Sequence, residues 1–250
     1  EEYGSGRSEE IVRDAVMGAR DEVIIATKFS PQHNSHAGVL NAVEASLRRL
    51  ETDYIDIYQV HWTNPAIPLI ETMTALRELL DSEKIRAIGV CNFSETEIAE
   101  SQEIVGPNRI SSLQTEFNLF ERTVEYSGLL SYCDENEISV LAYSPLDQGR
   151  FNNAGGQQRK ALESIAKDYD KTVAQVILRW LVSHGPVVPI VRTTNPSHLD
   201  DNINSFDFDL AERDIQEIDR VYPINIIEVP TDRIRPSPQG EWGHAVYMTL

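Results

Sequence analysis

Six short runs of β-branched and aliphatic residues recur along this chain, separated by segments in which apolar residues repeat at helical spacing. The runs lie at 23–27, 54–60, 85–90, 112–117, 138–143 and 187–191. Each has the composition of a buried or half-buried strand. Strands that alternate with helices form right-handed βαβ units and build a parallel sheet. The pattern predicts an α/β fold, either an open doubly wound sheet or a closed barrel, because this strand spacing suits both.

Helices are predicted between these strands. The clearest runs from 37 to 50, where Leu40, Val43 and Leu47 lie on one stripe. Near the start of the chain a helix is predicted from Glu9, with Ser8 as its N-cap and acidic residues in its first turn. Further helices are predicted at about 69–81, 94–104, 124–135, 159–169, 173–183 and 209–221.

Charge and composition limit the partners of the chain. The sequence has 40 acidic and 22 basic residues and a formal net charge of −18, so nucleic acid and anionic membranes would be repelled. No apolar run approaches the roughly 20 residues that span a bilayer, and no signal-peptide pattern stands at the front. The two cysteines, Cys91 and Cys133, match no metal or redox spacing. We therefore expect a cytoplasmic protein without a nucleic-acid or membrane partner.

Polar side chains stand at or near the end of nearly every predicted strand. Taken alone, each has an ordinary explanation: Lys28 could be a surface lysine, Asn92 could cap the next helix, and Gln114 could face solvent. Taken together they indicate a site, because parallel α/β proteins place their chemistry at the carboxyl ends of strands. The set comprises Lys28, His61, Asn92, Gln114, Tyr143 and Arg192.

Other motifs carry little weight. HNSH at 33–36 offers two histidines but no third ligand nearby, so no metal site is predicted. GSG at 4–6 lacks the third glycine of a dinucleotide loop and the lysine of a phosphate loop. No G-x-S-x-G elbow supports hydrolase chemistry.

Several segments together resemble the aldo-keto reductase family. EEYGSGRSE at the start of the chain is similar to the end of that family's D-T-A-x-x-Y-G-x-G-x-S-E segment, and AYSPLDQG at 142–149 to its Y-S-P-L-x-x-G. Further matches follow in order: ATK at 26–28, DYIDIYQVHW at 53–62, IRAIGVCNF at 85–93, LQTEFNLF at 113–120 and IVRTTNPSHLDDN at 190–202. The resemblance extends from residue 1 to about 221.

The resemblance implies a (β/α)8 TIM barrel that binds NADP(H), with NAD(H) as a second candidate. The six strands would be the last six of eight, so we expect the first two strands and an aspartate five residues before Tyr3 to be absent from this sequence. The barrel would occupy 1–221. Residues 222–250, with four prolines and no helical stripe, would form an extended tail packed on it, with Trp242 and Tyr247 as anchors; a partly disordered terminus is the alternative.

The resemblance also implies roles for individual residues. Tyr3, Lys28 and His61 would be catalytic, with Tyr3 as the proton donor. A tyrosine is a weak acid at neutral pH unless a cation such as Lys28 stabilises its phenolate. Cofactor contacts would come from Asn92, Gln114 and Tyr143 at the nicotinamide, Ser144 and Leu146 along the pyrophosphate, and Arg192, Thr193, His198 and Asn202 around the adenosine and its 2′-phosphate.

The function implied is hydride transfer between NADPH and an aldehyde, ketone or sugar carbonyl. The alternative is a cofactor-binding regulatory or channel-associated subunit with little turnover.

Two residues depart from the family pattern. Cys91 stands where the family commonly has serine, which removes a strong hydroxyl partner. His198 stands where arginine is common, and a mostly neutral imidazole holds a 2′-phosphate less firmly.

Overall fold

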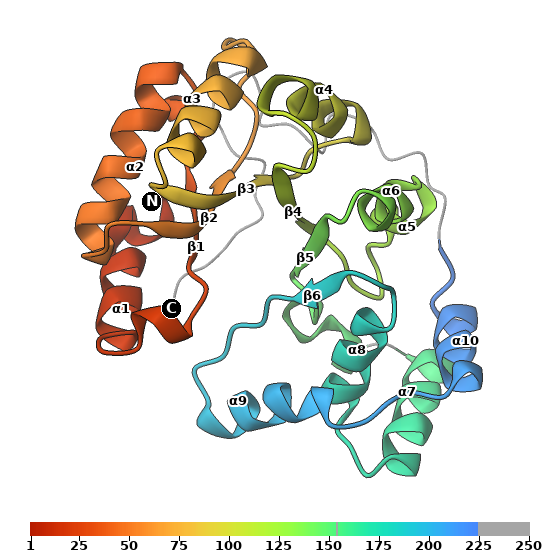
Figure 1. The fold of residues 1–250 in the computed structure, drawn as a ribbon. Coiled ribbons are helices and arrows are strands. Elements are labelled where there is room, and N and C mark those ends of the chain that lie inside the picture. The colour runs from red at the N-terminus through yellow and green to blue at the C-terminus, as the bar shows by residue number, and fades with distance from the viewer. Residues whose placement is uncertain (154, 225–250) are drawn as a thin grey trace.

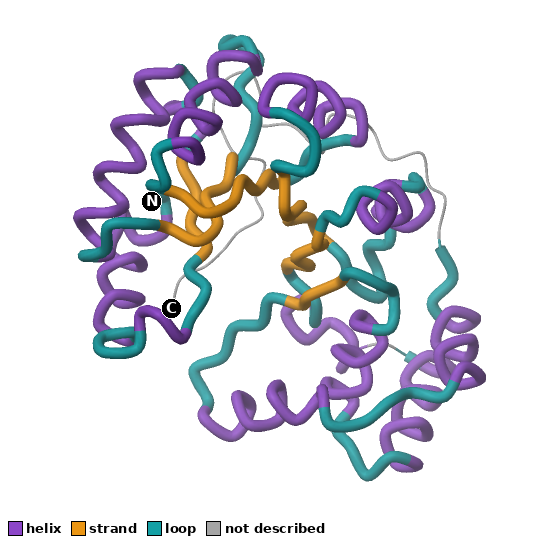
Figure 2. The backbone as a smooth tube through the Cα atoms, viewed as in Figure 1, coloured by secondary structure: helices purple, strands orange, loops and turns teal. Residues whose placement is uncertain are grey.

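Six parallel strands form one sheet in chain order in the computed structural model, which describes residues 1–153 and 155–224. Neighbouring strands pair side by side from β1 to β6 (Figure 1). The helices lie outside the strands (Figure 2), which is the arrangement of an α/β barrel. The six predicted strands are confirmed as β1 (Ala26–Phe29), β2 (Ile55–Val60), β3 (Ile85–Cys91), β4 (Ile110–Glu116), β5 (Ser139–Tyr143) and β6 (Val187–Pro189).

The predicted helices are also confirmed, with one division. The segment predicted at 124–135 is split by Gly128, whose φ of 82° interrupts the helical path. None of the described helices combines the length and apolar character that crossing a membrane requires. The helices are α1 (Arg7–Ala15), α2 (His36–Leu50), α3 (Leu69–Asp81), α4 (Glu95–Val105), α5 (Thr123–Tyr126), α6 (Leu129–Glu135), α7 (Gly156–Asp168), α8 (Val173–Val182), α9 (Pro196–Ile203) and α10 (Glu212–Val221).

The start of α1 differs from the prediction. Ser8 was expected to cap this helix, but the N-cap is Gly6 and Ser8 lies inside the first turn. The cause is a run of left-handed backbone, with φ values of 59° at Gly4, 53° at Ser5 and 93° at Gly6. This run turns the chain into the helix two residues earlier than a serine cap would. A Cβ at Gly6 would also lie 2.7 Å from Cδ of Arg49, so a side chain there would displace that arginine.

The helix α9 was not predicted from the sequence. Its two apolar side chains, Leu199 and Ile203, are 51% and 59% exposed, so it has no buried stripe to signal it. Local chemistry starts it instead: Asn195 is the N-cap, with its Oδ1 accepting from the backbone N–H of Ser197 at 3.1 Å, and Pro196 follows at the first helical position.

The two faces of the sheet differ in polarity. Side chains alternate between the two faces along each strand. The helix-facing side carries Tyr58, Ile88 and Leu113, which are fully buried. Thr27 on the same side donates to Glu9 of α1 at 2.7 Å. On the inner face the register aligns a row of residues: Lys28 opposite Gln59, Gln59 opposite Gly89, and Gly89 opposite Ser112. The inner face is therefore polar where it approaches the carboxyl ends of the strands.

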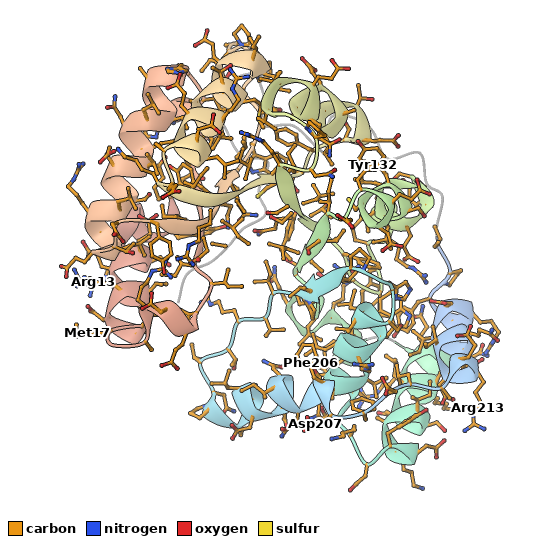
Figure 3. The ribbon with its side chains drawn as sticks, viewed as in Figure 1. Arg13, Met17, Tyr132, Phe206, Asp207 and Arg213 are labelled. Atoms are coloured by element: carbon orange, nitrogen blue, oxygen red, sulfur yellow. The ribbon has the colours of Figure 1, made fainter. Side chains whose placement is uncertain are left out.

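The surface of the helices is strongly charged. Figure 3 shows the side chains of Arg13 of α1 and Arg213 of α10 pointing outward from opposite sides of the fold. Arg13 pairs with Asp14 and with Glu51, at 2.8 and 3.1 Å, in contacts that water screens.

A buried ion-pair network fastens α10 to the rest of the fold. The Arg122 side chain is 6% exposed and donates to Oε1 of Glu125 at 2.7 Å and to the backbone oxygen of Tyr222 at 2.9 Å. It also pairs with Asp219 of α10 at 3.0 Å and lies 5.0 Å from the ring of Trp180. Tyr222 is 2% exposed, two residues before the end of the described chain. The remainder of the predicted tail, with Trp242 and Tyr247, lies outside the described residues.

Substitution of Arg122 by Met should lower the free energy of unfolding by about 2 kcal/mol, because it removes a buried cation and leaves the partly buried carboxylates of Glu125 and Asp219 without it. Arg159→Met is the matched control. Arg159 also pairs with a glutamate, Glu163 at 2.6 Å, but both side chains are at least half exposed, so the change should be within about 0.5 kcal/mol. Urea unfolding of both variants measures the difference. If the Arg122 and Arg159 variants lost the same small amount of unfolding free energy, the Arg122 network would not stabilise the fold.

Candidate active site

The three predicted catalytic residues meet at the carboxyl ends of β1 and β2. Nζ of Lys28 lies 5.2 Å from the centre of the Tyr3 ring, and the rings of Tyr3 and His61 are 5.9 Å apart. Tyr3 comes from the turn before α1, Lys28 from β1, and His61 from the residue directly after β2. Residues separated by up to 58 positions in sequence thus form one cluster.

The surroundings of Tyr3 and Lys28 suit proton transfer. Tyr3 is 53% exposed, so its ring can reach a bound molecule. Lys28 is half-buried, and its Nζ donates to Oε1 of Gln114 in a long contact of 3.4 Å. The ammonium group therefore lies between an amide oxygen and the face of a phenol. A cation within about 6 Å of an aromatic ring is attracted to the face of that ring.

His61 is held by a residue that the sequence did not indicate. Its Nδ1 lies 2.9 Å from Oε2 of Glu2, and the hydrogen bond from His61 lowers the pKa of the Glu2 carboxyl, against the opposing effect of burial. The His61 side chain is 17% exposed, so it lies at the edge of the site and not in the core. The only sequence signal for Glu2 is its position next to Tyr3. This contact fixes the orientation of the imidazole.

A second cluster lies beside the first, at the ends of β3, β4 and β5. The hydroxyl of Tyr143 donates to Oδ1 of Asn92 at 3.2 Å, and the backbone N–H of Asn92 donates to the backbone oxygen of Gln114 at 2.9 Å. Asn92 does not cap α4, because Ser94 does so in a capping box with Glu97. Gln114 does not face solvent, since it is 9% exposed. Neither alternative therefore holds: Asn92 is not the helix cap, and Gln114 is not at the surface.

Cys91 is the buried neighbour of these amides. It is 1% exposed, and burial raises the pKa of its thiol to about 12, against the opposing charge of Lys28. A neutral thiol is a weak hydrogen-bonding group. The amides of Asn92 and Gln114 are therefore the stronger hydrogen-bonding groups at this point.

Beyond β5 the chain makes a tight turn at the two residues predicted to follow the pyrophosphate. The backbone oxygen of Ser144 accepts from the N–H of Asp147 at 2.9 Å, and that of Leu146 accepts from Gly149 at 2.8 Å. Ser144, Asp147 and Gly149 have φ values of 51°, 41° and 84°. The turn therefore holds left-handed backbone at positions other than glycine, which requires support from neighbouring groups.

The four residues predicted around the adenosine divide into two groups. Arg192 and Thr193 precede α9, and Oγ1 of Thr193 accepts from the N–H of Asn195, the N-cap of that helix, at 3.0 Å. His198 lies exposed in the first turn of α9, so these three residues are close in sequence to a helix N-terminus, which favours anions. Asn202 lies one turn further on and is 8% exposed, so it packs toward the core.

An acidic group borders the site beside Tyr143. Glu116 is opposite Tyr143 in the β4–β5 ladder. Burial raises the pKa of the Glu116 carboxyl, and the nearby carboxylates of Glu121 and Asp147 raise it further. The ionised form of Glu116 is therefore disfavoured in the folded protein relative to the unfolded chain.

Glu116→Gln should make the protein more stable at neutral pH. The stability that wild-type Glu116 contributes when protonated is fully present below the ordinary glutamate pKa and is lost as the pH rises through its raised folded pKa. Glutamine has no charge to lose, so the variant's advantage should grow between the ordinary glutamate pKa and neutrality and disappear below it. Urea unfolding from pH 4 to pH 8 measures this difference. Glu100→Gln, on the exposed side of α4, is the control; an advantage for Glu116→Gln that does not depend on pH would contradict the assignment.

Comparison with known proteins places this geometry in context. The model of the family described as "Aldo/keto reductase family" matches residues 1–223. The methylglyoxal reductase YeaE of Escherichia coli (strain K12) is 34% identical over 224 residues, covering 89% of this chain and 78% of that protein. The glyoxal reductase of Bacillus subtilis (strain 168) is 33% identical, covering 88% of this chain and 73% of that protein. A crystal structure of an aldo/keto reductase from Klebsiella pneumoniae in complex with NADP and acetate is 34% identical and superposes with a TM-score of 0.82, covering 89% of this chain and 78% of that one.

Proposed function

The chain belongs to the aldo/keto reductase family, and we propose that it transfers a hydride between NADPH and the carbonyl carbon of an aldehyde, ketone or sugar. The observation that carries this proposal is the meeting of Tyr3, Lys28 and His61 at the ends of β1 and β2. An acid, a cation and an imidazole at one place are what the developing charge on a carbonyl oxygen requires.

The residues of the second cluster fit a nicotinamide dinucleotide. The ring of Tyr143, fixed at its hydroxyl by Asn92, offers a flat surface for the nicotinamide. The side-chain amides of Asn92 and Gln114 would hold the carboxamide. The bound dihydronicotinamide supplies the hydride. The Klebsiella pneumoniae relative, solved with NADP, supports this choice of cofactor.

The adenosine end would bind at the start of α9. Ser144 and Leu146 would follow the pyrophosphate. Arg192 and Thr193 would hold the 2′-phosphate, because a guanidinium and a helix N-terminus both favour that anion. His198 would add contact from the first turn of α9. Asn202, which is 8% exposed, would contact the adenosine one turn further along α9.

The chain's own groups would then complete the proton transfer. Tyr3 donates its hydroxyl proton to the carbonyl oxygen as negative charge develops there, and Lys28 stabilises the phenolate that remains. His61, oriented by Glu2, donates to the same oxygen and positions the substrate. In the oxidation direction the same groups act in reverse.

Small α-dicarbonyl compounds are the first substrates to test. Two relatives at 34% and 33% identity are named for the reduction of methylglyoxal and glyoxal.

Tyr3→Phe should lower kcat for carbonyl reduction by about 10²- to 10⁴-fold, because it removes the proton donor while keeping the ring. Binding of NADPH, followed by the quenching of protein fluorescence, should remain within about twofold of wild type. Tyr126→Phe is the matched control, since Tyr126 is an exposed tyrosine of α5 away from the strand ends. Turnover by the Tyr3 variant at the wild-type rate would refute the assigned acid.

Binding without turnover would instead favour the alternative, a regulatory or channel-associated subunit. The retained cluster of Tyr3, Lys28 and His61 favours an enzyme, because a cofactor-binding subunit without turnover needs no acid. A screen of NADPH with aldehydes, ketones and sugars in both directions separates these outcomes.

Arg192→Ala should raise the Kd for NADPH by about tenfold and leave the Kd for NADH almost unchanged. The reason is that a guanidinium–phosphate contact contributes roughly 1.5 kcal/mol to binding in an exposed site. NADH has no 2′-phosphate, so its binding does not depend on this contact. Titration with both cofactors measures the two constants. Arg213→Ala on α10 is the control for the loss of one exposed charge; equal weakening of NADPH and NADH would place Arg192 away from the 2′-phosphate.

A further inference from the structure

We propose that Asn118 is a positioning residue for the cofactor surface, because its side chain holds the backbone of Ser144 and, through it, the segment that follows Tyr143. This inference rests on the proposed function. Asn118 lies two residues after β4, and Ser144 directly follows β5, so the contact joins the ends of two neighbouring strands.

The hydrogen bonds of Asn118 divide between two loops. Its Oδ1 accepts from the backbone N–H groups of Phe120 and Glu121, both at 2.9 Å, which closes the turn after β4. Its Nδ2 donates to the backbone oxygen of Ser144 at 3.2 Å and to Oε1 of Glu116 at 3.3 Å. The side chain is 1% exposed, so water does not replace these bonds without cost. The acceptor half shapes its own loop, whereas the donor half reaches the cofactor segment.

Ser144 needs such a contact because its backbone is left-handed. Its φ is 51°, and Asp147 and Gln148 follow with φ values of 41° and 52°. A residue with a Cβ in this region costs about 1–2 kcal/mol relative to the right-handed region. The backbone oxygen of Ser144 accepts both from Asn118 and from the N–H of Asp147, so one oxygen anchors the start of the turn from two sides.

The same contact acts on Tyr143. The hydroxyl of Tyr143 is held by Asn92, and its backbone oxygen accepts from the N–H of Phe117 at 3.4 Å. Asn118 holds the next carbonyl along the chain. These successive contacts fix both the ring that would face the nicotinamide and the turn that would follow the pyrophosphate. A surface held in place before binding loses less entropy when the cofactor binds.

The test is Asn118→Asp in the full chain. Aspartate keeps the size of the side chain and the acceptor for Phe120 and Glu121, but it replaces the donor to Ser144 and Glu116 with an oxygen. The Kd for NADPH should rise about tenfold, with a much smaller effect on kcat at saturating NADPH. Asn136→Asp is the matched control, because Asn136 also donates from Nδ2 to a backbone oxygen, that of Tyr132 at 2.8 Å, but beyond α6. The Asn136→Asp variant should bind NADPH with the Kd of the wild-type protein.

A double-mutant cycle with Ser144→Gly separates positioning from added charge. Glycine adopts the left-handed region without steric cost, so residue 144 then depends less on Asn118. Asn118→Asp should therefore weaken NADPH binding by no more than about threefold in the Ser144→Gly background. The negative charge that this substitution adds acts equally in both backgrounds and cancels in the cycle. An equal loss of affinity in both backgrounds would overturn the inference.

Asn118→Ser provides a second variant if the aspartate prevents folding. A serine hydroxyl can still close the local turn but is too short to reach Ser144, so the same tenfold loss and the same relief by Ser144→Gly are expected. Wild-type protein that binds and oxidises NADPH, together with Asn118 variants that bind it equally well, would contradict this inference alone. Wild-type protein without NADPH binding would contradict the proposed function and this inference together.

Discussion

The parallel register of the sheet is the constraint on which the site depends. Parallel strands bring their carboxyl ends to one edge, and the two-residue alternation of side chains sends every second residue to the inner face. The register aligns Lys28, Gln59, Gly89 and Ser112 in one row on that face. Glycine at position 89 lets the side chains of Gln59 and Ser112 lie close on either side of it, because a Cβ there would lie 2.6 Å from Oγ of Ser112 and 2.8 Å from Cγ of Gln59. His61, Cys91 and Gln114 stand two residues further along their strands.

Charge is distributed unevenly over this arrangement. The chain carries a net charge of −18, yet Lys28 stands beside Tyr3, and Arg192 precedes the N-terminus of α9. At the end of β4 the carboxyl group of Glu116 has a raised pKa, so its negative charge is disfavoured there. Positive charge thus lies beside Tyr3 and just before the N-terminus of α9 in an otherwise acidic protein. The neutral amide of Asn118 connects Glu116 to the cofactor segment without adding to the acidity.

Much of the fold could be predicted from sequence because its strands and most helices have strong periodic patterns. The positions of Lys28, His61 and Gln114 near the strand ends could be predicted for the same reason, since they follow from where each apolar run ends. Features set by backbone conformation were missed: the left-handed Gly6 overrides Ser8 as the cap of α1, and α9 is started by Asn195 without an apolar stripe. Glu2 and Asn118 were missed because their partners lie 59 and 26 positions away, and no local pattern encodes such contacts.

The proposed chemistry is tested most directly by following the label from NADPH deuterated at C4 of the nicotinamide. If Tyr143 covers one face of the nicotinamide ring, the other face should point toward Tyr3 and the carbonyl carbon of the substrate. Deuterium should therefore appear on the alcohol carbon when one of the two C4 positions is labelled, and not when the other is. Transfer from both positions would contradict the binding of the nicotinamide against Tyr143. Binding of NADPH without transfer from either position would contradict the hydride-transfer function itself.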